Sequence, residues 1–185
     1  MSEPVTMLTD YALGAVSAWL GMRLFKFSKY WAGAFLALAL AAFLGGTWHG
    51  FVQSGLLWKA TLLCVGLASF AMVAGSARLT TQGVLAGVLM TFAALKLAAY
   101  SAWMLFHDQF IWVIVDTGSA LAAVAALHLW RFNGWMLAGV GASVAAALAQ
   151  AGGLALHRHF NHNDLYHVVQ IAAMLLFYRG LSEKR

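Results

Sequence analysis

Cysteine, proline and charge are all scarce in this sequence of 185 residues. The single cysteine, Cys64, excludes an intrachain disulfide and a cluster of thiolate metal ligands. The single proline, Pro4, precedes the apolar segments, so we expect no proline-broken helix of the kind that many transporters use for ion sites. Charged residues make up 9% of the chain, against roughly 25% in a soluble domain. They are too few to cover a surface that faces water.

Apolar residues, by contrast, are abundant and occur in long runs. They account for 63% of the chain, and a bilayer core needs ~20 of them per helix. The short N-terminal segment lacks the basic start of a signal peptide, so the first apolar run is expected to remain as a helix. The sequence predicts an all-α polytopic membrane protein, with residues 1–185 forming a single seven-transmembrane helix bundle. The predicted spans are about 8–25, 30–49, 55–76, 82–106, 109–130, 134–156 and 164–181.

The basic residues favour one orientation of these spans. Of the 11 lysines and arginines, eight fall on one side, two on the other, and Lys96 lies inside a span. Cytoplasmic loops are enriched in lysine and arginine, so the N-terminus is expected outside and the C-terminus in the cytoplasm. The net charge of +5 is then a topology signal and does not indicate nucleic-acid binding. The eight are Arg23, Lys26, Lys29, Arg78, Arg131, Arg179, Lys184 and Arg185, and the two are Lys59 and Arg158.

Histidines and carboxylates collect at the predicted outer face. His49 ends the second predicted span and His167 lies one turn inside the seventh, and Asp10 starts the first span on the same side. Histidine and carboxylate together are the ligands of zinc and similar ions. Asn163 or Asp164 also suits a cap for the last span. Four further histidines lie at this face: His107, His157 and His159, for which a solvated loop is the simpler interpretation, and His162.

Lys96 and Asp116 form a second polar feature, inside the predicted bilayer. Lys96 lies about 11 residues before the fourth loop and Asp116 about 8 after it, so antiparallel helices place them at similar depth. We interpret them as a charge-neutralising pair.

The last predicted span resembles the seventh span of the progestin and adiponectin receptors. The similar stretches are residues 163–168, NDLYHV, and 177–180, FYRG. Those receptors belong with the alkaline ceramidases in a superfamily of seven-span, zinc-dependent membrane hydrolases. Their pattern has a metal-binding histidine at the end of span two, matched by His49, and an H-x-x-x-H pair opening span seven, whose second member is matched by His167.

The chain departs from that pattern at three places. The first histidine of the pair is Asn163, the serine four residues before the span-two histidine is Gly45, and the third span contains no carboxylate. A third ligand would come from His162 or from Asp164. Asp164 and His167 are three residues apart on a helix, so they share a face.

The resemblance implies a zinc-dependent hydrolase acting at the outer face on a lipid amide or ester, such as a ceramide. Zinc would be held by His49, His167 and either Asp164 or His162, and would activate a bound water. Asp164 or Asp10 could act as general base, and Thr47, the hydroxyl nearest to Gly45, could position the oxyanion. The protein would then lie in a bacterial inner membrane with its site facing the periplasm.

Two other classes remain open at this point. A non-catalytic seven-span receptor or scaffold that has lost the metal is favoured by Asn163 and Gly45. A membrane cytochrome b would hold haem between histidines on facing helices, for which His49 with His167 or His107 would serve.

Overall fold

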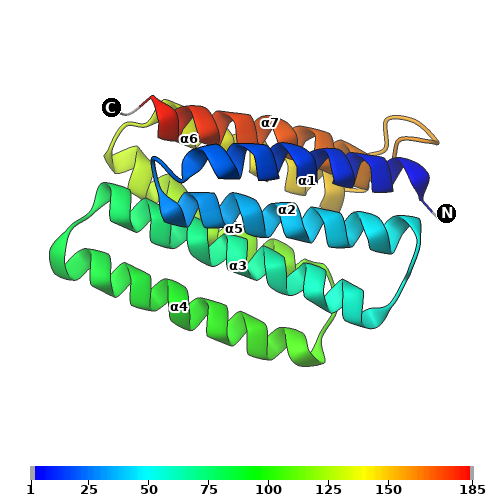
Figure 1. Ribbon diagram of the computed structural model, residues 1–185, viewed down its shortest axis with the longest axis horizontal. Coiled ribbons are helices and arrows are strands. Elements are labelled where there is room, and N and C mark those ends of the chain that lie inside the picture. Colours follow the sequence, from blue (N-terminus) through cyan, green and yellow to red (C-terminus); the bar gives the residue numbers. More distant parts are fainter. Residues whose placement is uncertain (1–2, 184–185) are drawn as a thin grey trace.

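The computed structural model describes residues 3–183, and within that range the chain folds into seven α-helices joined by short loops (Figure 1). This confirms the all-α fold and the number of helices predicted from the apolar runs. Lys184 and Arg185, two of the predicted cytoplasmic residues, lie outside the described residues. The helices are α1 (Pro4–Leu24), α2 (Lys29–Gly50), α3 (Gly55–Thr80), α4 (Gly83–Phe106), α5 (Ile111–Trp130), α6 (Gly134–Ala151) and α7 (His162–Ser182).

Three helix ends differ from the predicted ones by more than two residues, each for a local reason. α1 begins at Pro4 and not near residue 8, because proline is favoured in the first helical turn, where its missing N–H costs nothing. α3 continues to Thr80, past the predicted end at 76, since no helix-breaking residue interrupts it. α6 ends at Ala151 and not at 156, because Gly153 takes a left-handed φ of 65° that stops the helix.

Five of the helices, α2 to α6, are long and apolar enough to cross a bilayer. The chain is therefore an integral membrane protein. The remaining two, α1 and α7, are each 21 residues long but carry more polar side chains, including the buried Asp10, Asp164 and His167.

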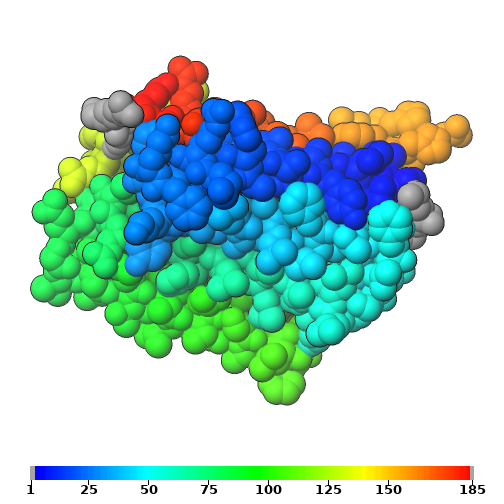
Figure 2. All heavy atoms as spheres, viewed as in Figure 1, coloured from blue at the N-terminus to red at the C-terminus, as the bar shows by residue number. Residues whose placement is uncertain are grey.

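Six helices close into a ring, and α4 lies outside it. Around the ring, α1 packs on α2, α2 on α3, α3 on α5, α5 on α6, α6 on α7, and α7 returns to α1. α4 packs mainly against α3 and forms one edge of the molecule (Figures 1 and 2). α4 and α5 are consecutive, yet α5 packs on α3, behind which it runs in Figure 1.

The predicted pair of Lys96 and Asp116 is confirmed, and it joins α4 to the ring. Lys96 Nζ lies 2.5 Å from Asp116 Oδ1 on α5 and donates to Ser69 Oγ on α3 at 2.9 Å. A neighbouring tie runs from the Tyr100 hydroxyl of α4 to the Leu62 carbonyl of α3, at 3.0 Å. Burying a charge requires such a partner.

The two ends of the bundle differ in chemistry. The chain enters and leaves at opposite ends (Figure 1). We call the end that carries His49 and His167 the histidine end, and the end that carries Arg23, Arg78 and Arg131 the basic end.

Candidate functional site

A cavity of about 310 Å³ opens at the histidine end, between α1, α2, α3, α6 and α7. Its walls include Asp10, His49, His162 and His167, four of the residues singled out from the sequence. Side chains that are far apart in the chain thus meet because the ring brings the start of α1, the end of α2 and the start of α7 together.

The closest contact in the cavity wall joins His167 to Asp10. His167 Nε2 on α7 lies 3.1 Å from Asp10 Oδ1 on α1. Both side chains are buried, with exposed fractions of 9% and 7%. Ionisable groups at such positions are costly unless they are paired, so the pair fixes how α1 and α7 meet.

The other nitrogen of His167 is also held. Its Nδ1 lies 3.0 Å from the hydroxyl of Thr9, which in turn lies 3.5 Å from Asp164 Oδ1. The expected common face of Asp164 and His167 is thereby confirmed, since both meet the same α1 hydroxyl. The imidazole is fixed from both sides, by Asp10 and by Thr9.

Asp164 also takes part in the cap at the start of α7. Its Oδ2 accepts the backbone N–H of Asn161 at 2.7 Å, and the Asn161 side chain accepts the N–H of Asp164, which is a capping box. The helix cap is therefore Asn161, and of the two predicted candidates only Asp164 contributes its side chain to the capping. Asp164 is 1% exposed and does not line the cavity.

His49 faces a carboxylate of its own. Its Nδ1 lies 2.8 Å from Glu3 Oε2, and the backbone N–H of Glu3 donates to the His49 carbonyl at 3.2 Å. These contacts bind the first described residue of the chain to the end of α2. Glu3 was not expected at the site, because nothing in its spacing points there.

Gly45 on α2 lies beside the Asp10 carboxylate. A Cβ there would lie 3.4 Å from Asp10 Oδ2, an ordinary contact. At the next position, a Cβ on Gly46 would lie 2.7 Å from the Tyr11 ring, so a side chain there would have to displace α1 or that ring. Where the resembling family has a serine, this chain therefore presents the α1 carboxylate.

The other candidates from the sequence lie elsewhere. Thr47 donates its hydroxyl to the Phe43 carbonyl at 2.7 Å, also meets the Tyr11 hydroxyl at 3.0 Å, and is not among the residues that line the cavity. His157 and His159 are exposed in the loop before α7, and His107 stacks on Trp103.

The histidine and aspartate side chains on the cavity wall are ligand types that zinc accepts, but they do not form a complete ligand set. Among residues 3–183, no three histidine, cysteine, aspartate or glutamate side chains are grouped closely enough, as they lie, to hold one ion. Asp10 and His167 supply two donor atoms 3.1 Å apart. His49 stands on the wall of the same cavity, with Nδ1 turned to Glu3.

One known protein family matches nearly the whole chain. The family described as DUF6962, a family of unknown function, matches residues 5–185. The chain belongs to DUF6962. No curated protein and no solved structure matches it.

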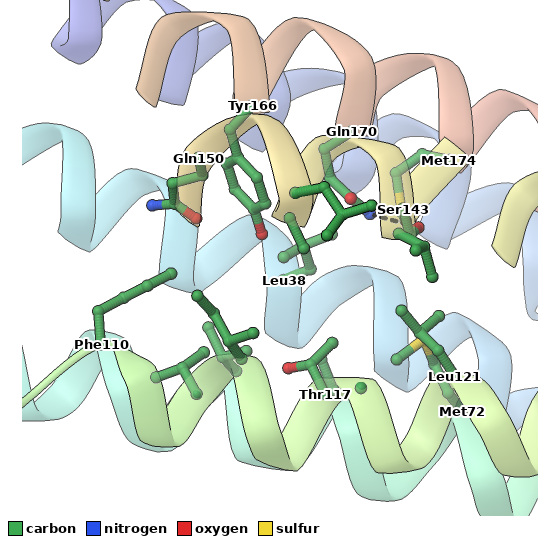
Figure 3. Close-up of a pocket in the computed structure, with 18 of the residues that line it drawn as sticks. Leu38, Met72, Phe110, Thr117, Leu121, Ser143, Gln150, Tyr166, Gln170 and Met174 are labelled. Atoms are coloured by element: carbon green, nitrogen blue, oxygen red, sulfur yellow. Dashed lines mark hydrogen bonds between the residues drawn. The ribbon is translucent and has the colours of Figure 1, made fainter. Parts of the chain in front are cut away.

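A second, apolar cavity in this DUF6962 chain adjoins the first. It measures about 240 Å³ and lies within the ring, between α2, α3, α5, α6 and α7 (Figure 3). The Tyr166 hydroxyl points into it, and Gln170 donates to Ser143 Oγ at 3.3 Å on its wall (Figure 3). Five residues line both cavities, so the two share a boundary: Leu38, Val65, Phe110, Gln150 and Tyr166.

Proposed function

We propose that this DUF6962 protein is a zinc-dependent membrane hydrolase that cleaves a lipid amide or ester at the outer face of the membrane. One observation carries the proposal: a cavity whose wall carries Asp10, His49 and His167 adjoins an apolar cavity in the bundle. An amphipathic lipid has the matching division, with a polar carbonyl region and an apolar chain.

The proposal includes seven spans with the N-terminus outside. α1 and α7 close the ring between apolar helices, and 21 residues at 1.5 Å each give about 31 Å, enough to cross the hydrocarbon core. The loops and helix ends at the basic end carry most of the lysine and arginine, which supports placing that end in the cytoplasm. In a bacterium the histidine end would face the periplasm.

Asp10, His49 and His167 are the proposed metal-holding residues. The donor atoms Asp10 Oδ1 and His167 Nε2 already lie 3.1 Å apart, and His49 lies on the same cavity wall. Asp10 is proposed as the third ligand in place of Asp164, because Asp164 is engaged by the capping box and lies beside Thr9. His162 lines the same cavity and stays an alternative third ligand. Three such ligands leave one position of a tetrahedral ion open.

Thr9 and Asp164 are positioning residues in this proposal. A metal-bound histidine is usually oriented through its second nitrogen by a hydroxyl, carbonyl or carboxylate. The chain from His167 Nδ1 to Thr9 and on to Asp164 has that form.

Zinc bound there would activate a water molecule for attack on a carbonyl. The remaining roles belong to the chain's own side chains. Tyr166 stands where the two cavities meet, and its hydroxyl can donate a hydrogen bond to the carbonyl oxygen. The apolar cavity holds the acyl chain and excludes water from it.

Elemental analysis of the purified protein tests the proposal. We expect about one zinc per chain, lost in His167→Ala and in Asp10→Asn, and retained in His107→Ala and Asp108→Asn, the matched changes outside the cavity. Chelation should abolish hydrolysis of a fluorescent acyl amide, and zinc should restore it. Metal-free protein of full stability would instead support a non-catalytic protein, and a haem absorption band would support a cytochrome.

A further inference from the structure

A third cavity lies at the basic end, away from the histidine site. It measures about 410 Å³ and is enclosed by the loop between α1 and α2, the ends of α3, α5 and α7, and the loop before α6. Polar side chains make up part of its wall, among them Lys26, Thr80, His128 and Asn133. No residue of the proposed hydrolase site belongs to it.

The charge around this cavity has one sign. Six basic residues within the described chain lie at this end, and the only carboxylate there, Glu183, is paired with Arg179. Within residues 3–183, no acidic side chain lines the cavity. A cavity of this kind repels metal cations and attracts anions. The six are Arg23, Lys26, Lys29, Arg78, Arg131 and Arg179.

Hydrogen-bond donors reach the cavity from several elements. Lys26 lies in the loop after α1, and its Nζ lies over the Phe27 ring, 5.1 Å from the ring centroid, without a carboxylate partner among residues 3–183. Arg131 is not itself on the wall, but its Nε donates to the carbonyl of the lining residue Thr80 at 3.0 Å, which holds the guanidinium beside the cavity. His128, only 2% exposed, lies 3.2 Å from Ser76 Oγ.

Cytoplasmic loops generally prefer basic residues, and this preference explains only why lysine and arginine are common at this end. It does not account for a cavity into which a buried histidine and a lysine from different elements both face. A buried histidine is costly unless it has a polar partner, and His128 has one in the Ser76 hydroxyl of α3.

We propose that this cavity binds the phosphate group of an anionic ligand. Lys26 on its wall provides the charged donor, with the Arg131 guanidinium held beside the wall at Thr80, since arginine and lysine bind phosphate oxygens through charge-assisted hydrogen bonds. Basic pockets between transmembrane helices on the cytoplasmic side are known places for phospholipid headgroups. The ligand is either such a headgroup or a soluble phosphate, and binding here is independent of hydrolysis at the other end.

Thermal unfolding of the purified protein in uncharged detergent tests this first. Inorganic phosphate should raise the unfolding temperature more than chloride at equal ionic strength. Lys26→Ala should weaken the apparent phosphate affinity about tenfold, the loss of one charged hydrogen bond, and Lys26→Arg should restore it. Lys29→Ala is the matched control, because it removes the same charge from the same end without touching the cavity wall.

A second arm separates the two sources of phosphate. The protein is placed in nanodiscs of phosphatidylcholine, with or without phosphatidylglycerol. Stabilisation by phosphatidylglycerol that depends on Lys26, without an effect of inorganic phosphate, identifies a lipid headgroup, and the reverse identifies a soluble ligand. The proposal is overturned if neither probe stabilises the protein, or if Lys29→Ala weakens binding as much as Lys26→Ala does.

Discussion

Two buried polar clusters in this molecule have similar chemistry but different surroundings. Lys96 and Asp116 meet where α3, α4 and α5 pack, and neither residue lines either of the two cavities described at the histidine site. Asp10 and His167 meet on the wall of a cavity. We call the Lys96–Asp116 cluster closed, because neither of the two cavities reaches it, and the Asp10–His167 cluster open, because it lines one. A closed cluster holds helices together, whereas an open cluster can also bind a ligand. The difference separates structural from functional interpretations more clearly than residue type does.

The largest expected effect comes from breaking the closed cluster. Lys96→Met or Asp116→Leu alone leaves one uncompensated charge in the bundle and should cost about 3 kcal/mol or more of unfolding free energy. The double variant should cost less than either single change, because no charge remains. Denaturation of all four proteins in the same detergent measures this cycle. If the double variant loses the sum of the two single losses, the pair does not hold α4 in place.

The open cluster should respond differently. Thr9→Val removes the hydroxyl between His167 and Asp164. We expect zinc affinity to fall by about 10- to 100-fold, the usual effect of losing a partner of a metal-bound histidine, with only a small change in stability. Thr9→Ser should recover most of the affinity.

A competition titration with a fluorescent chelator measures the Thr9 effect. Thr117→Val is the matched control, because Thr117 lies on the wall of the apolar cavity and not beside His167. Equal losses in both variants would show that the Thr9 hydroxyl does not orient the imidazole.

The sequence predicts these two clusters unequally. The Lys96–Asp116 pair follows from helix rise and a short loop, because α4 and α5 are consecutive and both charges sit at similar depth. His167 and His49 were recognisable as candidates by their place at span ends. The role of Thr9 was not recognised, although Thr6, Thr9 and Asp10 have the spacing of one helix face, a signal that was available.

Other features could not be read from the chain. The contact between Asp10 and His167 depends on α7 returning to α1, and short loops say nothing about how a ring closes. The displacement of α4 and both cavities of the histidine site likewise arise from the packing of several helices. Helix ends were predicted to within a few residues, with the misses at α1, α3 and α6 explained by local chemistry.

The smallest expected effect concerns Gly45 and Gly46, the two neighbouring glycines of α2 that pack against α1 at Asp10. Alanine gains up to about 1 kcal/mol of helix propensity over glycine. At Gly46 this gain is outweighed, because the new Cβ would lie 2.7 Å from a Tyr11 ring whose hydroxyl is fixed by Thr47. Overpacking of this kind costs about 1–3 kcal/mol, so Gly46→Ala should destabilise the protein by about 1 kcal/mol and shift α1 at Asp10.

Gly45→Ala is the internal control for that change. Its Cβ would meet Asp10 Oδ2 at 3.4 Å, an ordinary contact, so the propensity gain should remain and stability should be unchanged or slightly higher. Thermal unfolding of the two variants side by side gives the sign of each effect. Because Asp10 moves only in Gly46→Ala, zinc binding should weaken in that variant and persist in Gly45→Ala. If the two glycines behave alike, the close approach of α1 to α2 does not position the carboxylate.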